Sequence, residues 1–382
     1  MRQAQKQYEG NDYWLRYLTI NDSYLEEWYN IWGGNEYEHG YGIAIDENNR
    51  IYLVGATSTF GAGNYDGFIV KYQSNGTLLW NRTWGGPEDE HYYDVAVFEN
   101  SIYVAGDTFT YGVGNYDGIL MKYHSNGMLL WNRTWGGSGN DYSRGVATDK
   151  EGCCYLAGYT NLSDGNYQDA FIAKYDASGN QLWNHTWGRQ DKYDRGYGIS
   201  VTNDNQCLLI GQTWRDSNGY DAFIAKYDAN GKQLWNQTWG TPNYEVGRSV
   251  AVDSNNSYYL LGYLLNTTTL LEYVFLVKFD SNGSQLWNRT WGGFDIDSNM
   301  DMTMDNKGQV LFTGSIMSFG GDDDIFFVKY GSEGDLQWNK TWGCPENDHS
   351  YGILVDSNNL SLIHISEPTR PLYISYAVFC LK

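Results

Sequence analysis

The dipeptide Trp-Gly recurs at nearly constant intervals along the chain. Its tryptophans are Trp32, Trp84, Trp135, Trp187, Trp239, Trp291 and Trp342, so that successive copies lie 51 or 52 residues apart. A period of this length, held over six intervals, is the sequence signature of an array of similar supersecondary units. The repeat therefore favours a ring or a stack of units over a single irregular fold.

Each unit has the pattern of four short strands. The unit that follows Trp239 has apolar or alternating runs at 249–253, 258–263, 274–279 and 285–291, separated by polar turns such as Asp280-Ser281-Asn282-Gly283. Strands bounded by Asn-Gly turns indicate antiparallel hairpins. The composition agrees, because 17% of the residues are aromatic and 45 are glycine. No segment shows a helical period with caps.

Four strands in about 50 residues, repeated around a ring, is the arrangement of a β-propeller. A linear β-solenoid is the alternative, but antiparallel hairpin turns argue against it. We therefore predict an all-β propeller of about seven four-stranded blades of 51–52 residues. Residues 12–17 and 28–32 match the last two strands of a unit and residues 351–356 match the first, so both chain ends would close the last blade. Its second strand has no counterpart, and the blade is expected to be truncated.

Several segments carry a resemblance to a known repeat. They are Asp169–Asp176 with Ser178–Trp183, Asp221–Asp228, Gly42–Asp46 and Tyr52–Thr57. These units resemble the SBBP-type β-propeller repeat family of bacterial and archaeal proteins, and the resemblance covers residues 12–359. It implies a propeller of WD40-like architecture in an exported or cell-surface protein. It implies little about activity, because the family is defined by its repeat.

The end of the chain departs from the repeat. Residues 360–370 resemble the first part of an in-frame translation of a transposase-type sequencing adapter, residues 374–381 resemble its end, and residues 371–373 fit the index between them. We therefore expect an N-terminal extension at 1–11, a propeller at 12–359 and a non-native tail at 360–382. The alternative is a genuine segment in which residues 360–365 take the place of the missing strand.

The fourth strand of each unit repeats Trp-Asn-x-Thr-Trp. Strand alternation places both tryptophans and the central residue on one face, and the central residue is often cationic, as in Arg82, Arg133, Arg289 and Lys340. A cation between two indoles favours cation–π contact. We expect these stacks to fix neighbouring blades together; the alternative is an exposed row of sugar-stacking rings. The tryptophans are Trp80, Trp84, Trp131, Trp135, Trp183, Trp187, Trp235, Trp239, Trp287, Trp291, Trp338 and Trp342.

An acidic residue recurs just before the first strand of each unit. By the family resemblance this strand lines the central channel, so the carboxylates would gather at one mouth and repel one another unless cations or N–H donors compensated. Oxygen ligands suit Ca²⁺ or Mg²⁺; the alternative is that each carboxylate accepts backbone N–H groups of its own turn. Three histidines at the same level suggest a transition-metal site as a further alternative. The candidate ligand-binding residues are Glu38, His39, Glu90, His91, Asp141, Asp194, Glu245, Asp297, Asp348 and His349.

The charge balance limits the partners. The chain has 25 Lys and Arg against 46 Asp and Glu, a net charge of −21, which repels nucleic acid. No apolar run approaches the roughly 20 residues of a transmembrane helix. The five cysteines form no Cys-x-x-Cys pair, and no phosphate loop or nucleophile motif occurs.

Because every unit carries nearly the same residues, whereas catalysis needs unlike groups brought together, we predict a non-catalytic module for protein or glycan binding, or a scaffold. It would be a monomeric part of a longer chain, with no cofactor other than a possible Ca²⁺. The alternative is a metal-assisted hydrolase or lyase that uses Glu38, His39, Glu90, His91, Asp348 and His349.

The origin of residues 360–382 can be tested by resequencing. We expect source DNA amplified across codon 359, without transposase adapters, to continue in propeller-type sequence. A product in which codons 360–382 remain joined to the gene would contradict the adapter interpretation.

Overall fold

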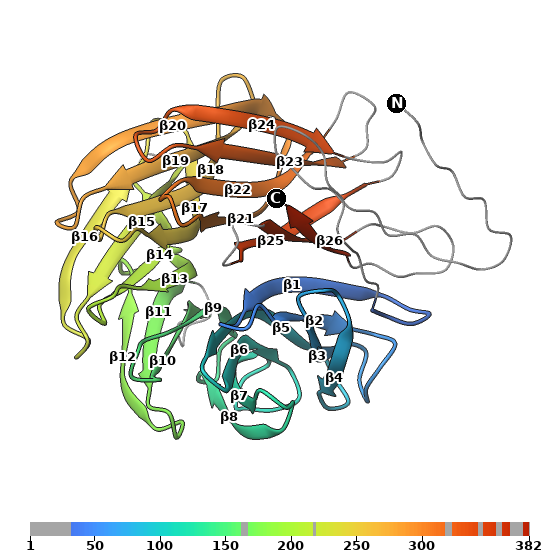
Figure 1. Cartoon of the computed structure of the whole chain (residues 1–382). Coiled ribbons are helices and arrows are strands. Elements are labelled where there is room, and N and C mark those ends of the chain that lie inside the picture. Colours follow the sequence, from blue (N-terminus) through green and yellow to red (C-terminus); the bar gives the residue numbers. More distant parts are fainter. Residues whose placement is uncertain are drawn as a thin grey trace, which may run out of the picture.

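The regular structure of the described residues is entirely β-strand. The computed structural model describes residues 32–161, 167–216, 219–317, 323–342, 347–356, 361–366 and 377–381, the last two segments and residues 297–298 by their backbone alone. The strands form six four-stranded sheets and one three-stranded sheet, all antiparallel and each in the order of the sequence. Figure 1 shows the sheets following one another around a central space, with their first strands innermost.

Each four-stranded sheet is one blade. Blade 1 consists of β1 (Glu38–Ile45), β2 (Ile51–Thr57), β3 (Asp66–Tyr72) and β4 (Leu78–Trp84). Blade 2 consists of β5 (Glu90–Phe98), β6 (Ser101–Thr108), β7 (Asp117–His124) and β8 (Leu129–Trp135). Blade 3 consists of β9 (Asp141–Thr148), β10 (Cys154–Asn161), β11 (Gln168–Tyr175) and β12 (Gln181–Trp187).

The second half of the ring repeats this plan. Blade 4 consists of β13 (Arg195–Val201), β14 (Cys207–Arg215), β15 (Gly219–Tyr227) and β16 (Gln233–Trp239). Blade 5 consists of β17 (Tyr244–Val252), β18 (Tyr258–Leu265), β19 (Glu272–Phe279) and β20 (Gln285–Phe294). Blade 6 consists of β21 (Ile296–Met304), β22 (Val310–Met317), β23 (Asp323–Tyr330) and β24 (Leu336–Trp342). The seventh sheet consists of β25 (His349–Val355), β26 (Ser361–Ser366) and β27 (Ala377–Leu381).

The prediction of about seven four-stranded blades is wrong, because the ring has six. Seven Trp-Gly copies enclose only six complete units, and the chain after Trp342 supplies three strands to the seventh sheet. The expected contribution of residues 12–17 and 28–31 to this sheet lies outside the described residues. Strand pairing of residues 361–366 with β25 does not test the predicted adapter origin of that segment.

The first strand of the seventh sheet nevertheless closes the inner ring. The Ile353 N–H of β25 donates to Asp301 Oδ2 of β21 at 3.0 Å, and Tyr351 meets the Tyr41 ring of β1 edge-on, with centroids 5.6 Å apart. Leu354 packs in one apolar cluster with Leu53 of β2. Seven first strands therefore surround the channel.

The hydrophobic core lies between the blades. The second and third strands are buried along almost their whole length, as in β2, β3, β6 and β7. One cluster joins Val54 and Ile69 of blade 1 to Val104 and Met121 of blade 2. Because both faces of these strands are covered, their sequences are continuous apolar runs rather than alternating ones. The fourth strands form the exposed outer edge of the ring.

In blades 1 to 5, donors from the third and fourth strands also hold a turn of the next blade. In blade 2, Lys122 Nζ and Trp131 Nε1 donate to the Ala177 carbonyl at 2.9 and 3.2 Å, and Arg133 Nε donates to the Gly179 carbonyl at 2.8 Å. Gly179 has a φ of +81°, which suits glycine, and a Cβ there would lie 2.9 Å from the Trp131 indole. We call this three-donor contact the turn clamp.

The turn clamp recurs around the ring with small variations. Lys71, Trp80 and Arg82 bind the turn of blade 2 at 2.8–3.2 Å. In blade 5, Lys278 Nζ donates to the Ser332 carbonyl at 3.1 Å and Arg289 Nε to the Gly334 carbonyl at 2.6 Å. The guanidinium carbons of Arg82, Arg133 and Arg289 lie 5.3–5.6 Å from the Trp80, Trp131 and Trp287 ring centroids, respectively.

The last tryptophan of each fourth strand packs on the following blade. Trp135 stacks on Phe171 with centroids 3.6 Å apart, and Trp187 stacks on Phe223 at 3.9 Å. Trp239 and Trp291 make the same contact, tilted, with Phe275 and Phe326. Trp80, Trp131, Trp183, Trp235, Trp287 and the other described strand-four tryptophans are half-buried, with one face against the protein.

The contribution of these stacks can be measured by truncation. Phe171 is fully buried, so Phe171→Ala should lower the free energy of unfolding by about 3–5 kcal/mol. Leu182→Ala, at an outer-edge side chain that is 52% exposed, is the control and should change it by no more than about 0.5 kcal/mol. Urea denaturation followed by tryptophan fluorescence measures both. Equal stability of the two variants would contradict the packing described here.

Candidate functional site

The predicted channel-mouth acids lie at or beside the start of each first strand. Every described carboxylate among them is buried, with an exposed fraction of at most 1%: Glu38, Glu90, Asp141, Asp194, Glu245 and Asp348. The Asp297 side chain lies outside the described residues. These positions meet at one end of the ring, because the first strands run side by side around the channel.

The carboxylates bind the turns that precede their own strands. Glu90 Oε2 accepts the Gly86 N–H at 2.6 Å and its Oε1 accepts the Thr108 hydroxyl at 2.8 Å. Asp141 Oδ2 accepts the Gly137 N–H at 2.7 Å. The same type of N–H contact recurs at Glu38, Asp194 and Glu245. The arrangement matches the alternative in which each acid holds its own turn, and cation binding at these residues stays a prediction.

A second acid from the preceding blade lies beside several of these carboxylates. Burial, together with the nearby charge of Asp194, raises the pKa of Asp169 to about 6. Burial also raises the pKa of Glu38 and of Glu245, although hydrogen bonds from Thr59 and Thr241 oppose the shift. Burial at the mouth therefore shifts these acids toward their neutral form.

The three mouth histidines remain apart. The His39 and His91 rings each pack against Tyr65, with centroids 6.0 and 5.4 Å away, and burial lowers the pKa of both. His349 Nε2 lies 3.7 Å from Asp323 Oδ2. Within the described part of the chain, no group of three His, Cys, Asp or Glu ligand atoms gathers at the mouth.

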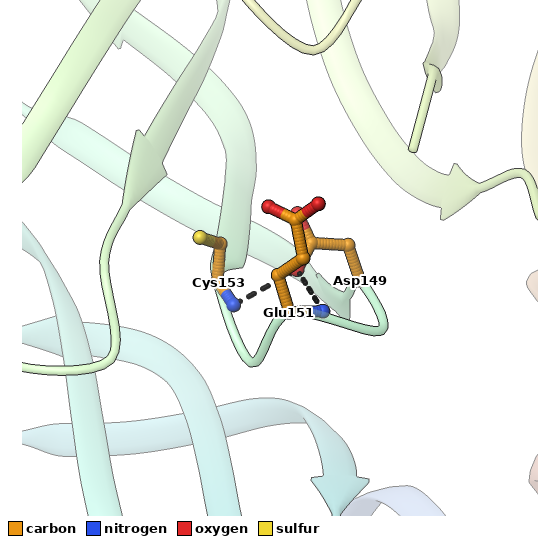
Figure 2. Close-up of side chains that lie close together, drawn as sticks. All are labelled: Asp149, Glu151 and Cys153. Atoms are coloured by element: carbon orange, nitrogen blue, oxygen red, sulfur yellow. Dashed lines mark hydrogen bonds between the residues drawn. The ribbon is translucent and has the colours of Figure 1, made fainter. Parts of the chain in front are cut away.

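One such group occurs elsewhere, at the turn after β9. Asp149, Glu151 and Cys153 bring a ligand atom each to within 4.8 Å of one another (Figure 2). Asp149 Oδ1 accepts the Glu151 and Cys153 N–H groups at 3.0 and 2.9 Å. Its Oδ2 lies 3.1 Å from Lys174 Nζ. The Asp149 carboxylate thus accepts hydrogen bonds within its own turn and pairs with the Lys174 ammonium. The arrangement therefore fits a structural turn better than a metal centre.

Aromatic rings lie beside the mouth acids over blades 1 to 5. They come from the starts of the first and third strands and the ends of the second strands, and successive rings contact one another, as in Tyr116–Tyr142 at 5.6 Å and Tyr142–Tyr159 at 5.0 Å. All are half-buried, so part of each ring stays open to solvent. We call this set the aromatic belt: His39, Tyr65, His91, Tyr116, Tyr142, Tyr159, Tyr197, Tyr220 and Tyr244.

Below the mouth, the channel contains a cavity of about 300 Å³. Every first strand contributes to its lining, and each does so with the residue three positions after the mouth acid. These residues differ from blade to blade: Tyr41, Tyr93, Arg144, Tyr197, Arg248, Met300 and Tyr351. The channel is thus a place where the repeat brings unlike side chains together, as binding sites require.

Two carboxylates line the same cavity one position further along. Asp94 accepts the N–H groups of Val95 and of Val146 in the next blade, both at 2.8 Å. Asp301 accepts the Ser249 hydroxyl at 2.9 Å and a backbone N–H of β25. Burial raises the pKa of Asp94 to about 7 and that of Asp301 to about 6, against the effect of these donors. Both acids join adjacent first strands, and burial favours the neutral form of each.

Sequence reasoning found the mouth acids and histidines but missed the aromatic belt and the channel residues. The candidate residues were those that recur from unit to unit, whereas the channel residues occupy a position that varies between units. Aligning the seven first strands on their acids would have revealed Arg144 and Arg248 among tyrosines.

Comparison with known proteins supports the fold. A family model described as a domain of unknown function (DUF5122) β-propeller matches residues 47–78. This match supports a β-propeller repeat, and the SBBP type stays a prediction. In the described residues, no helix is long and apolar enough to cross a membrane.

Two curated proteins are similar to parts of the chain. Regulatory protein FlaEY of Caulobacter vibrioides is 25% identical over 240 residues, which are 55% of this chain and 25% of that protein. An uncharacterized WD repeat-containing protein, L264 of Acanthamoeba polyphaga mimivirus, is 28% identical over 153 residues, 33% of this chain and 10% of that protein. The matches thus span only a quarter and a tenth of these relatives.

Solved structures show the same architecture. The WD40 domain of Neurospora crassa Pan2 superimposes with a TM-score of 0.55 and 8% identity, covering 94% of this chain and 97% of that one. The structure of YCF48 bound to D1 peptide gives a TM-score of 0.54 and 9% identity, covering 95% and 96%. At these identities the likeness shows a WD40-like propeller fold alone.

The raised pKa of Asp94 predicts how stability depends on pH. Its folded-state pKa of about 7 lies above the value of about 3.9 of an unfolded aspartate, so between these values the folded protein holds a proton that the unfolded chain releases. The free energy of unfolding should therefore rise as the pH falls from 8 to 5.5. Asp94→Asn removes this contribution, and its melting temperature should rise less than that of the wild type over the same range.

The matched control is Asp216→Asn. Asp216 is exposed, and its hydrogen bond from Arg189 lowers its pKa, so this variant should keep the wild-type rise. A rise in Asp94→Asn equal to that of the wild type would contradict the assignment.

Proposed function

We propose that this chain is a non-catalytic binding module that takes a glycan at the mouth of its central channel. The observation that carries the proposal is the aromatic belt, in which half-buried rings from blades 1 to 5 lie beside the mouth acids. Rings of this kind offer an apolar face together with a polar edge. Sugar rings present the complementary surface, with apolar C–H faces and hydroxyl edges.

The belt suits binding better than catalysis. Its histidines pack against tyrosine, and the neighbouring carboxylates hold turns. A metal-assisted hydrolase would need these donors to converge on one ion, and none of the described residues at the mouth do so. The location expected from the repeat resemblance, outside the cell or at its surface, belongs to the same proposal.

The fold is compatible with more than one ligand class. YCF48, a propeller of similar fold, has been solved with a bound D1 peptide, which supports the use of such a ring as a binding platform. A peptide ligand is therefore the other outcome that the experiment must distinguish. The glycan is favoured here because the mouth offers a series of contacting rings rather than a single pocket.

The test is a screen of the purified chain on a glycan array and a peptide array. We expect glycan binding, and we expect Tyr116→Ala with Tyr142→Ala to weaken it about tenfold, because each aromatic contact is worth about 0.5–1.5 kcal/mol. Leu182→Ala with Leu234→Ala, at exposed outer-edge side chains, should bind as the wild type does. Glycan binding that is unchanged in the Tyr116→Ala, Tyr142→Ala double variant would overturn the proposal, and so would binding to peptides alone.

A further inference from the structure

Two arginines line the channel at the same repeat position, and their surroundings differ. Arg144 Nη1 lies 2.7 Å from Asp107 Oδ2, and its guanidinium carbon lies 3.9 Å from the Tyr93 ring centroid. Asp107 is almost fully buried and also accepts the Ser143 N–H at 2.8 Å. The charge of Arg144 is thus neutralised within the protein.

Arg248 has the aromatic contacts without the carboxylate. Its guanidinium carbon lies 4.3 Å from the Tyr197 ring centroid and 5.5 Å from that of Tyr263. No described acid lies within ion-pair distance of it. Its Nε has no hydrogen-bond partner, and the Tyr263 hydroxyl hydrogen-bonds to the side chain. Because no carboxylate of the protein neutralises this half-buried guanidinium, an external anion is a favourable partner.

A change of residue at one repeat position explains why Arg144 has a carboxylate partner and Arg248 has none. Asp107 follows Gly106 near the end of β6, and Gln212 follows Gly211 at the matching place in β14. The blade before Arg248 therefore offers a neutral amide where the blade before Arg144 offers a carboxylate. Gln212 is buried and accepts a 3.4 Å hydrogen bond from the Tyr197 hydroxyl, so it holds Tyr197 without adding charge.

The cavity next to Arg248 can accept an anion despite the acidic chain. The two nearest channel acids, Asp94 and Asp301, are bound to neighbouring strands. The cavity of about 300 Å³ has room for a group the size of one sugar residue. A ligand with many negative charges would be repelled by the net charge of −21, so a single carboxylate on an otherwise neutral molecule fits best.

We propose that Arg248 binds the carboxylate of a uronic-acid-type sugar residue that enters the channel, with the sugar ring beside Tyr197. A guanidinium recognises a carboxylate through two parallel N–H donors, and the tyrosine supplies a stacking face. The inference rests on the proposed function, because it names the sugar class taken at the same mouth. Tyr197 belongs both to the aromatic belt and to the lining of the cavity, so the Arg248 site continues the belt into the channel and adds a charged group to it.

The experiment compares two small probes on the full chain. Methyl β-glucuronide and its uncharged analogue methyl β-glucoside differ in the carboxylate, and calorimetry with saturation-transfer NMR measures both. We expect the glucuronide to bind at least about tenfold more tightly, since hydrogen bonds to charged groups are the stronger class.

The decisive variant rebuilds the missing ion pair. Gln212→Asp places a carboxylate where Asp107 meets Arg144, so it should remove the preference for the glucuronide while the chain melts as the wild type does. Gln212→Asn is the matched control and should keep the preference. Arg248→Gln should also lose it, whereas Arg50→Gln, at an outer turn with a 43% exposed side chain, should not.

Equal affinity for the two probes, or a Gln212→Asp variant that still prefers the glucuronide, would overturn the inference. Preferential capture of a peptide C-terminal carboxylate at Arg248, without glucuronide binding, would also overturn it. In either case, glycan-array binding that depends on Tyr116 and Tyr142 would leave the proposed function standing, so the two failures are distinguishable.

Discussion

The turn clamp is the interaction on which the ring depends. Each blade ends in an exposed fourth strand, and a strand edge left alone is a weak point of a β-sheet. The ammonium, indole and guanidinium donors of one blade capture the carbonyls of a turn in the next, as Lys122, Trp131 and Arg133 do for residues 177–179. Their cationic groups also lie over aromatic rings, so polar and apolar contacts between blades coincide.

The first strands take no part in the turn clamp, so their side chains are less constrained than those of the third and fourth strands. The clamp uses the third and fourth strands, and first-strand residues such as Val95 and Leu354 pack in the apolar clusters. The rest of the first strand is constrained chiefly by its mouth acid and its pairing with the second. One position on it can therefore vary, and it holds tyrosine in four sheets, arginine in two and methionine in one. The position that holds Asp107 in blade 2 holds Gln212 in blade 4. Arg248 therefore has no carboxylate partner in the channel.

Much of the fold could be predicted from the sequence, because the 51–52-residue period and the hairpin turns specify a propeller locally. The blade number could not, since it depends on which strands the chain ends add to the last sheet. The spacing indicated an acid before each first strand, but the buried contacts of these acids with Gly86 and Gly137 required coordinates. The pairing of Arg144 and the isolation of Arg248 depend on contacts between blades, which a period alone does not reveal.

The central claim is that a uniform outer scaffold presents one variable inner ring as the binding site. A crystal structure of the chain grown with methyl β-glucuronide tests it most directly. The account predicts the sugar within the channel, with its carboxylate on the Arg248 guanidinium and its ring beside Tyr197. A sugar found instead on the outer fourth strands, against Trp131 or its counterparts, would contradict the account.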